Sequence, residues 1–369
     1  MRRSIIEVHA LQTVPPANLN RDDTGSPKTA LFGGQRRARV SSQSWKRAIR
    51  LDFRSTLDDT DLGWRTKQIV ALVADRIKAT APELADQARE LAVKAFNDGG
   101  IKVKIQKKDD EIEESGYLVF LSRHQVDNLA GAIVEAARAG EKLEKKAAKA
   151  ILHDRHSIDV ALFGRMIADD AALNVDAACQ VAHAISVHPV ETEFDYFTAV
   201  DDQKDQDDET GAGMIGTVEF NSSTLYRYAN LDVNLLRHNL GDDAATARAA
   251  AAFVRSFITS MPSGKMNTFA NRTLPEAVLV TVRDTQAINL VGAYEKPIME
   301  VDGRIETACE LLAAQLAEIA ETYGEEPVRT WVVRVGDRTK GLAETGEQVS
   351  LQDLLAGIEA DVTERIGAA

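Results

Sequence analysis

Residues 194–228 read FDYFTAVDDQKDQDDETGAGMIGTVEFNSSTLYRY and contain the clearest strand signals of the chain. Phe194 to Val200 and Val218 to Tyr228 are rich in the aromatic and β-branched residues that favour strands. The segment between them, residues 201–213, is acidic and ends in glycine, as turn regions commonly do. The stretch therefore predicts a long β-hairpin with a mobile tip.

Weaker signals extend this pattern to both ends of the chain. Ser4 to Gln12 alternates as a strand does, and the prolines at 15 and 16 are expected to end that strand. We predict further strands over 277–282 and 328–335, a charged hairpin over 101–121, and helices over 41–57, 66–97, 125–152, 177–186, 230–261, 305–323 and 351–366. Ser350 and Asp353 form a capping-box pattern before the last helix. Strands near both ends with helices between them predict an α+β fold with a large helical insertion.

The composition is that of a globular protein without a disulfide framework. Of the 369 residues 44% are hydrophobic, which is enough for a substantial core in two or three units. Cys179 and Cys309 are too few for a disulfide framework and form no C-x-x-C pair. Glu7 and His9 interrupt the apolar run that a signal peptide needs, and no stretch has the apolar length of a membrane span. We therefore expect a soluble cytoplasmic protein.

Basic residues are concentrated in one block, although the chain as a whole is acidic. The net charge of -13 argues against non-specific coating of nucleic acid but permits a local site. Residues 33–50, GGQRRARVSSQSWKRAIR, contain six basic residues and no acidic one. Ser41 or Ser42 is the expected helix N-cap. On a helical wheel one face holds Trp45, Ala48, Ile49 and Phe53, and another holds Lys46, Arg47, Arg50 and Arg54. A solvated helix face normally mixes both signs of charge, so we favour phosphate binding, with Ser41, Ser42 and Gln43 as additional donors.

Four lysines in the predicted helix 125–152 are spaced to share one face: Lys142, Lys145, Lys146 and Lys149. Because Glu141 and Glu144 flank them, a solvated helix face is the simpler interpretation. The functional alternative is weak, salt-sensitive steering of a polyanion.

Other motifs carry little chemistry. Gly211, Gly213 and Gly216 spell G-x-G-x-x-G, but an acidic run precedes them and a strand-like segment follows, so we reject a dinucleotide site. The pairs His153–His156 and His183–His188 lack a third metal ligand at a recognisable spacing. No nucleophile or Walker motif is present, and we expect no cofactor and no metal.

Two short segments leave alternatives open. The loop containing Gly264 and Lys265 can contact a phosphate or a sugar. Asp22 and Asp23 are adjacent carboxylates near the basic block, so they can hold a metal for phosphodiester cleavage or pair with Arg21. The pairing is the simpler interpretation.

Several motifs in a fixed order resemble one family, the CasC backbone subunit of the type I-E CRISPR surveillance complex Cascade. They are NLNRDD at 18–23, LFGG at 31–34, RRARVSSQS at 36–44, DVALFGRM at 159–166, AHAI at 182–185, DYFTAVDD at 195–202, GTVEF at 216–220 and YRYAN at 226–230. The resemblance spans nearly the whole chain and is weakest over 57–153 and after 275.

The resemblance implies a right-hand-like protein. Its palm is a modified RNA-recognition-motif, ferredoxin-like fold, its fingers are a helical insertion, and its thumb is a long β-hairpin. By this resemblance the palm takes residues 1–58 and 222–369, with a connection at 183–189, while the fingers take 59–182 and the thumb 190–221. Residues 101–121 have no clear counterpart in the family.

The family resemblance also implies a function. Such a subunit is not an enzyme: it polymerises head to tail along the CRISPR RNA, kinks out nucleotides at regular intervals, and presents the guide to target DNA in antiviral defence. The implied partners are the guide RNA, target DNA, other copies of the chain, and the large, small, guide-processing and 5′-handle-binding subunits, with no membrane. The alternative is a metal-dependent RNA-cleaving backbone subunit of a type III-like complex that uses Asp22 or Asp23.

The family's functional positions fall on residues of this chain. The implied RNA-binding residues are Asn20, Arg21, Lys28, Ser41, Gln43, Lys46, Arg47, Arg50 and Lys265, and the implied nucleotide-kinking residues are Met166, Phe197 and Thr198. Tyr196 departs from the family, which commonly has another aromatic there. The lysines from Lys142 to Lys149 resemble a basic finger surface offered to target DNA.

Overall fold

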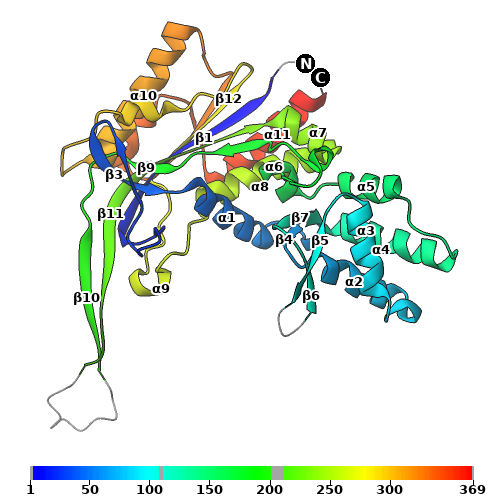
Figure 1. The fold of residues 1–369 in the computed structure, drawn as a ribbon. Coiled ribbons are helices and arrows are strands. Elements are labelled where there is room, and N and C mark those ends of the chain that lie inside the picture. Colours follow the sequence, from blue (N-terminus) through cyan, green and yellow to red (C-terminus); the bar gives the residue numbers. More distant parts are fainter. Residues whose placement is uncertain (1–2, 108–110, 201–211, 368–369) are drawn as a thin grey trace. The chain divides into compact units, whose positions relative to one another are not determined.

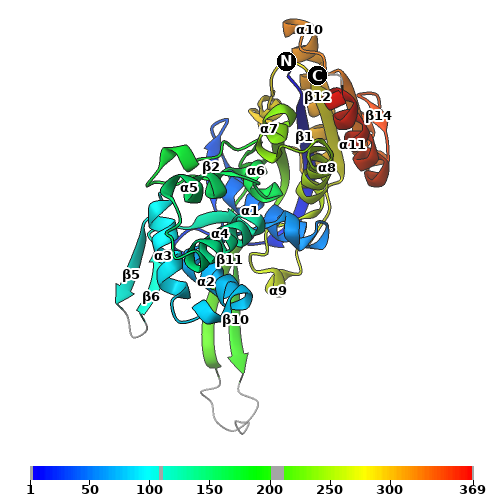
Figure 2. The same ribbon diagram turned by 90° about the vertical axis from the view of Figure 1, so that its right-hand side faces the viewer.

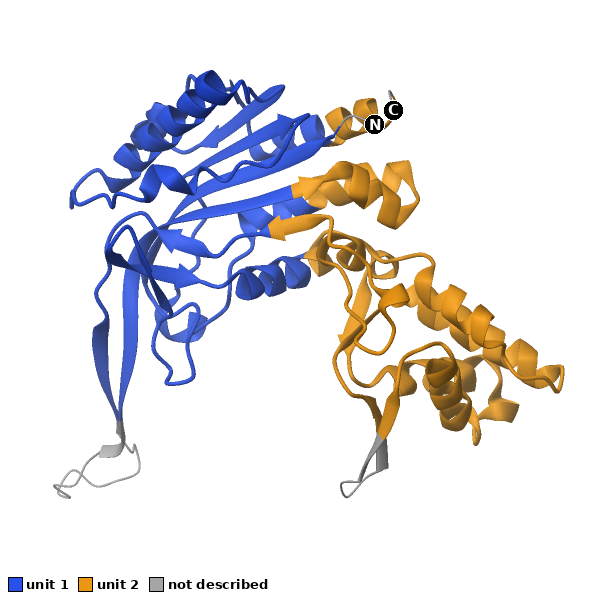
Figure 3. Ribbon diagram, turned by 45° about the horizontal axis from the view of Figure 1, so that its top comes forward, with its two compact units in different colours: residues 1–52, 181–230, 253–358 blue, residues 53–180, 231–252, 359–369 orange. Residues whose placement is uncertain are grey.

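The structure, a computed structural model, describes residues 3–107, 111–200 and 212–367. The chain divides into two compact units, of which unit 1 comprises residues 1–52, 181–230 and 253–358 and unit 2 comprises residues 53–180, 231–252 and 359–369 (Figure 3). The predicted α+β class is confirmed, since a large sheet and many helices coexist (Figure 1).

The main sheet has ten strands and is centred on β1 (Ile5–Ala17), which is buried along nearly its whole length. Its order is β14-β13-β12-β1-β11-β9-β3-β2, and β8 and β10 also pair with β11. The other strands are β2 (Thr29–Phe32), β3 (Gln35–Val40), β8 (Cys179–Val181), β9 (Ala184–Ser186), β10 (Glu193–Val200), β11 (Ala212–Asp232), β12 (Ala277–Arg283), β13 (Arg329–Arg334) and β14 (Glu347–Gln348). The prolines at 15 and 16 lie inside β1, so the prediction that they end the strand is wrong.

The two faces of the sheet in unit 1 are covered by different helices, because side chains alternate along each strand. Leu11 of β1 and Tyr226 of β11 point into a core shared with α10 (Arg304–Tyr323). Arg227, the next residue of β11, points to the opposite face and contacts Trp45 of α1 (Ser42–Asp52). The basic helix therefore packs on the face of the sheet that is turned away from α10.

Unit 2 is a helical layer with two short two-stranded sheets. Its helices are α2 (Ile69–Thr80), α3 (Ala88–Asp98), α4 (Arg123–Arg138), α5 (Lys145–His153), α6 (Ile158–Phe163) and α7 (Val233–Leu240). In one sheet β4 (Gly63–Thr66) pairs with β7 (Val119–Ser122), and in the other β5 (Val103–Lys107) pairs with β6 (Glu111–Ser115). Helices α2, α3 and α4 pack against one another around a common apolar core (Figure 2).

The remaining elements are mostly short. They are α8 (Asp243–Thr259), α9 (Met266–Phe269), α11 (Leu351–Gly367) and 3₁₀ turns at Phe53–Ser55, Asp59–Asp61, Pro82–Leu84, Ala171–Leu173, Leu290–Tyr294 and Asp337–Leu342. No helix within the described ranges is long and apolar enough to cross a membrane.

Four predicted helices differ from the structure. The helix predicted over 66–97 is divided into α2 and α3, and the helix predicted over 230–261 is divided into α7 and α8, with Gly241 at a φ of +66° between them. Residues 177–186 form β8 and β9 instead, whose side chains alternate between buried and more exposed positions. The helix predicted over 125–152 is broken after Arg138, where Gly140 adopts a φ of +68° and residues 141–144, which belong to no helix or strand, lead to α5. Lys142 therefore lies outside any helix, and the predicted helical stripe of four lysines does not form.

The predicted long hairpin is present as β10 paired with β11. Its register runs from Glu193 opposite Phe220 to Val200 opposite Ala212, with an irregularity at the last pair. The predicted tip falls mainly on residues 201–211, outside the described residues.

Candidate nucleic-acid interface

Helix α1 starts at the end of an internal strand of the main sheet. Strand β3 pairs with β9 through Arg39 opposite Ile185 and Val40 opposite Ala184, and the chain enters the helix directly afterwards. The Ser44 N–H donates to Ser41 Oγ at 3.3 Å, so Ser41 is the side chain that caps the helix. The sheet thereby fixes where the basic helix begins.

The two faces predicted for α1 are both present. Trp45 is 1% exposed, and Ala48, Ile49 and the following Phe53 are buried with it. Gln43 and Arg47 are exposed, while Lys46 and Arg50 are half-buried. Long basic side chains can bury their stems along such a surface and keep their charged ends in water. The helix thus offers cations and a donor on one side and an apolar anchor on the other.

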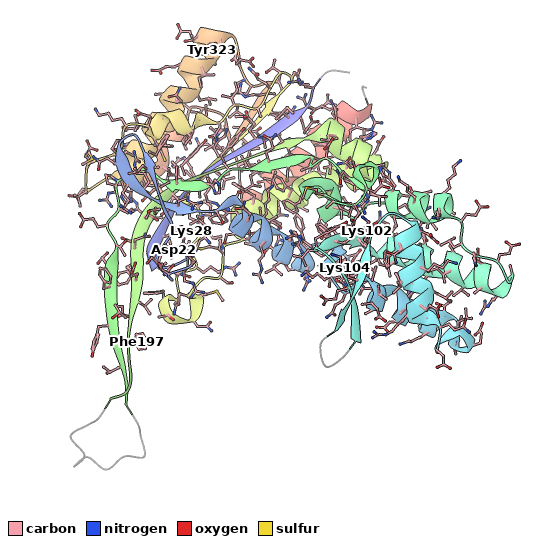
Figure 4. The ribbon with its side chains drawn as sticks, in the orientation of Figure 1. Asp22, Lys28, Lys102, Lys104, Phe197 and Tyr323 are labelled. Atoms are coloured by element: carbon pink, nitrogen blue, oxygen red, sulfur yellow. The ribbon has the colours of Figure 1, made fainter. Side chains whose placement is uncertain are left out.

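The loop over residues 18–28 is tied to the start of α1 and to the base of the long hairpin. Asn20 Oδ1 accepts from the Ser41 N–H at 2.9 Å, and the Lys28 N–H donates to the Asn20 carbonyl at 2.9 Å. Asn18 Nδ2 donates to the Glu219 carbonyl of β11 at 2.8 Å. These bonds hold the loop beside the helix, where Lys28 is half-buried (Figure 4). Arg21, in the same loop, is exposed.

The loop that contains Lys265 packs against the same segment. A Cβ atom added to Gly264 would lie 2.3 Å from the Leu19 carbonyl oxygen, so only glycine permits this approach. Lys265 follows with a φ of +50° and is half-buried. The structure therefore brings the nine predicted RNA-binding residues into one region of unit 1: Asn20, Arg21, Lys28, Ser41, Gln43, Lys46, Arg47, Arg50 and Lys265.

This region is electropositive. Within the described ranges Arg21, Lys28, Lys46, Arg47 and Lys265 take part in no ion pair. Asp22 directly follows Arg21, but its carboxylate stabilises the turn over residues 22–26. Its Oδ1 accepts from the Thr24 hydroxyl at 2.7 Å and from the Ser26 N–H at 3.0 Å. The Thr24 hydroxyl bond is the main cause that lowers the pKa of Asp22. The cations are thus available to a polyanion.

Phe197 and Thr198 lie on opposite faces of the β10–β11 ribbon. Phe197 is opposite Gly216, where an added Cβ would lie 2.5 Å from the Phe197 Cζ atom, so the ring covers the glycine. Thr198 is exposed on the other face, together with Phe194 and Tyr196, which are 66% and 63% exposed. The exposed rings of Phe194 and Tyr196, on one face of the ribbon, are suited to stacking on bases.

Met166 belongs to unit 2, where it follows a buried arginine. Its side chain is 78% exposed and lines a cavity of about 680 Å³ with Arg65 and Leu118. The neighbouring Arg165 guanidinium donates to the Leu173 and Leu152 carbonyls, and burial lowers its pKa to about 10. Arg165 thus fixes the backbone from which Met166 projects.

Two of the four predicted DNA-steering lysines form ion pairs within unit 2. Lys145 lies 3.5 Å from Asp98, and Lys149 lies 2.5 Å from Asp170. Lys142 and Lys146 are exposed and form no ion pair within the described residues. The lysines are therefore not equivalent, which the sequence spacing alone did not indicate.

The histidine pairs do not assemble a metal site. Within the described residues no group of three or more His, Cys, Asp and Glu side chains could hold a metal ion. His188 is used structurally: its Nε2 accepts from the Thr224 N–H at 3.0 Å, and its Nδ1 lies 2.7 Å from the Pro189 carbonyl oxygen. His183 lies beside α1, where its Nδ1 accepts from the Ser42 N–H, a placement that the sequence reasoning missed.

Comparisons with known proteins agree with this architecture. A family model described as CT1975-like protein matches residues 6–357. A chain of a "CRISPR RNA-guided surveillance complex, pre-nicking" is 34% identical, with a TM-score of 0.85, 97% of this chain covered and 100% of that chain. A chain of a second "CRISPR RNA-guided surveillance complex" is 30% identical, with a TM-score of 0.74, 96% of this chain covered and 99% of that chain. A comparison with curated protein sequences gives no match. Because the family match spans nearly the whole sequence and both structural relatives are similar over their full length, the chain belongs to the CT1975-like protein family.

Proposed function

We propose that the chain is the guide-binding backbone subunit of a CRISPR RNA-guided surveillance complex of type I-E. The observation that carries the proposal is the basic region of unit 1, where the exposed Arg47 and the half-buried Lys46 of α1 lie beside a loop with Arg21 and Lys28. Cations that contact phosphates bind a strand of any sequence, as a subunit that carries different guides requires. The similarity to chains of two surveillance complexes supports the same role.

In this proposal the elements correspond to the palm, fingers and thumb of a right-hand-like protein. The main sheet is the modified RNA-recognition-motif, ferredoxin-like palm, the helical segment within 59–182 is the fingers, and β10 with β11 is the thumb. Phe197 and Thr198 of the hairpin and Met166 of the fingers open the base stack at regular intervals, which costs a few kcal/mol per step. The phosphate contacts hold the remaining nucleotides, whose bases stay free to pair with target DNA.

The subunit polymerises head to tail along the guide RNA. A head-to-tail contact that does not close into a ring produces a helical filament. Its partners are further copies of the chain, the guide RNA, target DNA and the large, small, guide-processing and 5′-handle-binding subunits of a cytoplasmic complex. The proposed role is antiviral interference without catalysis by this chain. In its support, the bonds of Asp22 to Thr24 and Ser26 favour a turn-forming role for that carboxylate over metal ligation.

Charge reversal on α1 tests the proposal. We expect the triple variant Lys46→Glu, Arg47→Glu, Arg50→Glu to weaken RNA binding equally for guides of different sequence and to flatten its salt dependence. The matched control reverses the charges of Arg329, Arg338 and Lys340, which changes the net charge of the chain by the same amount. These three residues lie on or near β13, which is separated from β3 by β1 in the strand order of the main sheet. Equal affinity of the α1 variant and the wild-type chain, or an equal loss in the control, would contradict the proposed interface.

A second experiment separates this function from RNA cleavage. The assembled complex is incubated with complementary RNA and Mg²⁺, and we expect the RNA to remain intact. Regularly spaced cuts that disappear in Asp22→Ala or Asp23→Ala would establish the rival, a metal-dependent nuclease subunit.

A further inference from the structure

The pairing of β3 with β9 brings a histidine to the first turn of the basic helix. Val40 is opposite Ala184 in this antiparallel pair, so one step further along the strands Ser41 meets His183. The Ser42 N–H donates to His183 Nδ1 at 3.1 Å. The Ser42 N–H has no acceptor within the helix, and it donates to the imidazole instead. It is therefore not available to a ligand.

The bond to Ser42 decides which nitrogen of His183 carries the proton. Nδ1 accepts a hydrogen bond, so the neutral ring must carry its proton on Nε2. A protonated ring would point an Nδ1–H at the donating amide of Ser42. Partial burial, followed by the positive charges of Arg39 on β3 and Lys28 before β2, lowers the pKa of His183. The ring is therefore neutral at pH 7, with an N–H donor on the side away from Ser42.

That donor is accessible, and two cations lie near it. His183 is exposed, and within the described part of the chain Nε2 has no hydrogen-bond partner. Arg39 of β3 lies two residues before Ser41, so its side chain is on the same face of the pair as His183, and its backbone N–H donates to the Lys28 carbonyl at 2.9 Å. Lys28 and Arg39 both line a small cleft with Asn20. A neutral N–H donor beside two cations matches the oxygens of a phosphodiester, which accept hydrogen bonds and carry one negative charge.

We propose that His183, together with Lys28 and Arg39, forms a binding subsite for one phosphodiester of the RNA strand, in which Nε2–H donates to a phosphate oxygen. The inference rests on the proposed RNA-binding function and adds two residues, His183 and Arg39, to the interface. His183 acts as a neutral hydrogen-bond donor, in contrast to the lysines and arginines of α1. Its contribution should therefore depend little on salt.

Two substitutions separate the phosphate contact from support of the helix. In His183→Asn the amide oxygen can still accept from Ser42 but no donor reaches the position of Nε2. In His183→Gln the longer amide places a donor near Nε2 and loses the acceptor at Nδ1. The full-length chain is titrated with a short single-stranded RNA of mixed sequence, and its urea denaturation midpoint is measured in parallel.

We expect His183→Asn to weaken RNA binding about tenfold at an unchanged denaturation midpoint. His183→Gln should bind RNA within about twofold of the wild-type chain at a lowered midpoint. The slope of log affinity against log salt should stay unchanged in His183→Asn, whereas Lys46→Gln should reduce it by about one. The affinity ratio of the wild-type chain to His183→Asn should also be equal at pH 8 and pH 7.

The outcomes distinguish this subsite from the wider function. If Lys46→Gln weakens binding and His183→Asn does not, the subsite is wrong and the RNA-binding function stands. If neither variant weakens binding, the proposed function itself fails. If both His183 variants lose RNA affinity in proportion to the fall in their urea denaturation midpoints, His183 has a purely structural role. If His183→Asn reduces the slope of log affinity against log salt, His183 binds as a cation. Either result would overturn the proposed neutral donor.

Discussion

The guanidinium carbon of Arg227 lies 3.7 Å from the centroid of the Trp45 ring, and both side chains are buried. Arg227 belongs to β11 and Trp45 to the basic helix α1. Arg227 Nη1 donates to Gln12 Oε1 at 2.6 Å, and Nη2 donates to the Phe257 carbonyl. Burial lowers the pKa of Arg227 to about 9, so the group remains charged at pH 7. The helix proposed to bind RNA is therefore anchored to the sheet through a buried cation.

We expect Arg227→Met to lower the free energy of unfolding by about 3 kcal/mol, measured by urea denaturation. The substitution leaves the Gln12 side-chain oxygen and the Phe257 carbonyl without their donor in a buried site. A double-mutant cycle with Trp45→Leu should give a coupling of about 1–2 kcal/mol between the two side chains.

Arg329→Met is the matched control for this pair. Arg329 also lies over a tryptophan, Trp331, but its guanidinium is 5.5 Å from the ring centroid and the residue is exposed. We expect a cost below about 1 kcal/mol there. Equal costs for the two substitutions would contradict the role of Arg227 as the anchor of α1.

A second prediction concerns the stability of unit 1 in mild acid. His9 of β1 is fully buried between Tyr226 and Tyr228, and its Nδ1 lies 2.8 Å from the Tyr226 hydroxyl. Burial is the main cause that lowers the pKa of His9 from 6.5 to about 4. Between these two values the unfolded chain binds a proton and the folded chain does not. The contribution of His9 to the free energy of unfolding, about 3 kcal/mol, is therefore fully present above pH 6.5 and is lost as the pH falls to 4.

Guanidinium denaturation at pH 7 and pH 4.5 measures this effect. His9→Phe, which fills the site without a titrating group, should show a smaller drop between the two pH values than the wild-type chain. His124→Gln, at an exposed position, should show the wild-type drop. A pH dependence that His9→Phe leaves unchanged would assign the loss to other groups, such as the partly buried His156 of unit 2.

The sequence predicts elements well where one periodicity is clear. The helix expected over 305–323 is α10, because Leu312 and Leu316 bury one face against the sheet. The prediction fails over 177–186, where alanine-rich residues with helical propensity are drawn into β8 and β9 by pairing with distant strands. Such pairing depends on partners that a local pattern does not contain.

The candidate site divides in the same way. The basic and apolar faces of α1 follow from residue spacing alone, and the structure has both. The proximity of Lys265 to Asn20 depends on the packing of Gly264 against Leu19, and the position of His183 depends on the register of β3 and β9. The ion pairs of Lys145 and Lys149 with aspartates of other segments could not be read from helical spacing either.

A third prediction concerns the hairpin. Gly216 leaves room for the Phe197 ring, which an added Cβ would meet at 2.5 Å. Gly216→Val should therefore displace the ring and reduce assembly on RNA, measured as the number of chains per RNA by native mass spectrometry, at an unchanged melting temperature. Thr217→Val, on the exposed face of the same strand, is the control and should assemble normally. Normal assembly of Gly216→Val would remove Phe197 from the proposed kinking role.

The final prediction separates the four lysines of unit 2. Lys142 and Lys146 are exposed without ion pairs in the described residues, whereas the charges of Lys145 and Lys149 are partly neutralised by Asp98 and Asp170. Lys142→Gln with Lys146→Gln should weaken binding of the assembled complex to target DNA and flatten its salt dependence, because each free cation releases a counterion on binding.

The matched control is Lys145→Gln with Lys149→Gln, which removes the same charge and should weaken DNA binding less. Its cost should appear in the free energy of unfolding, at less than about 1 kcal/mol for each pair, since these are surface ion pairs. Both double variants are assembled with the same guide RNA, so that DNA affinity is compared at equal loading. If the two variants lose equal affinity, pairing with aspartate does not restrain Lys145 and Lys149, and if neither loses affinity, these lysines are an ordinary solvated surface.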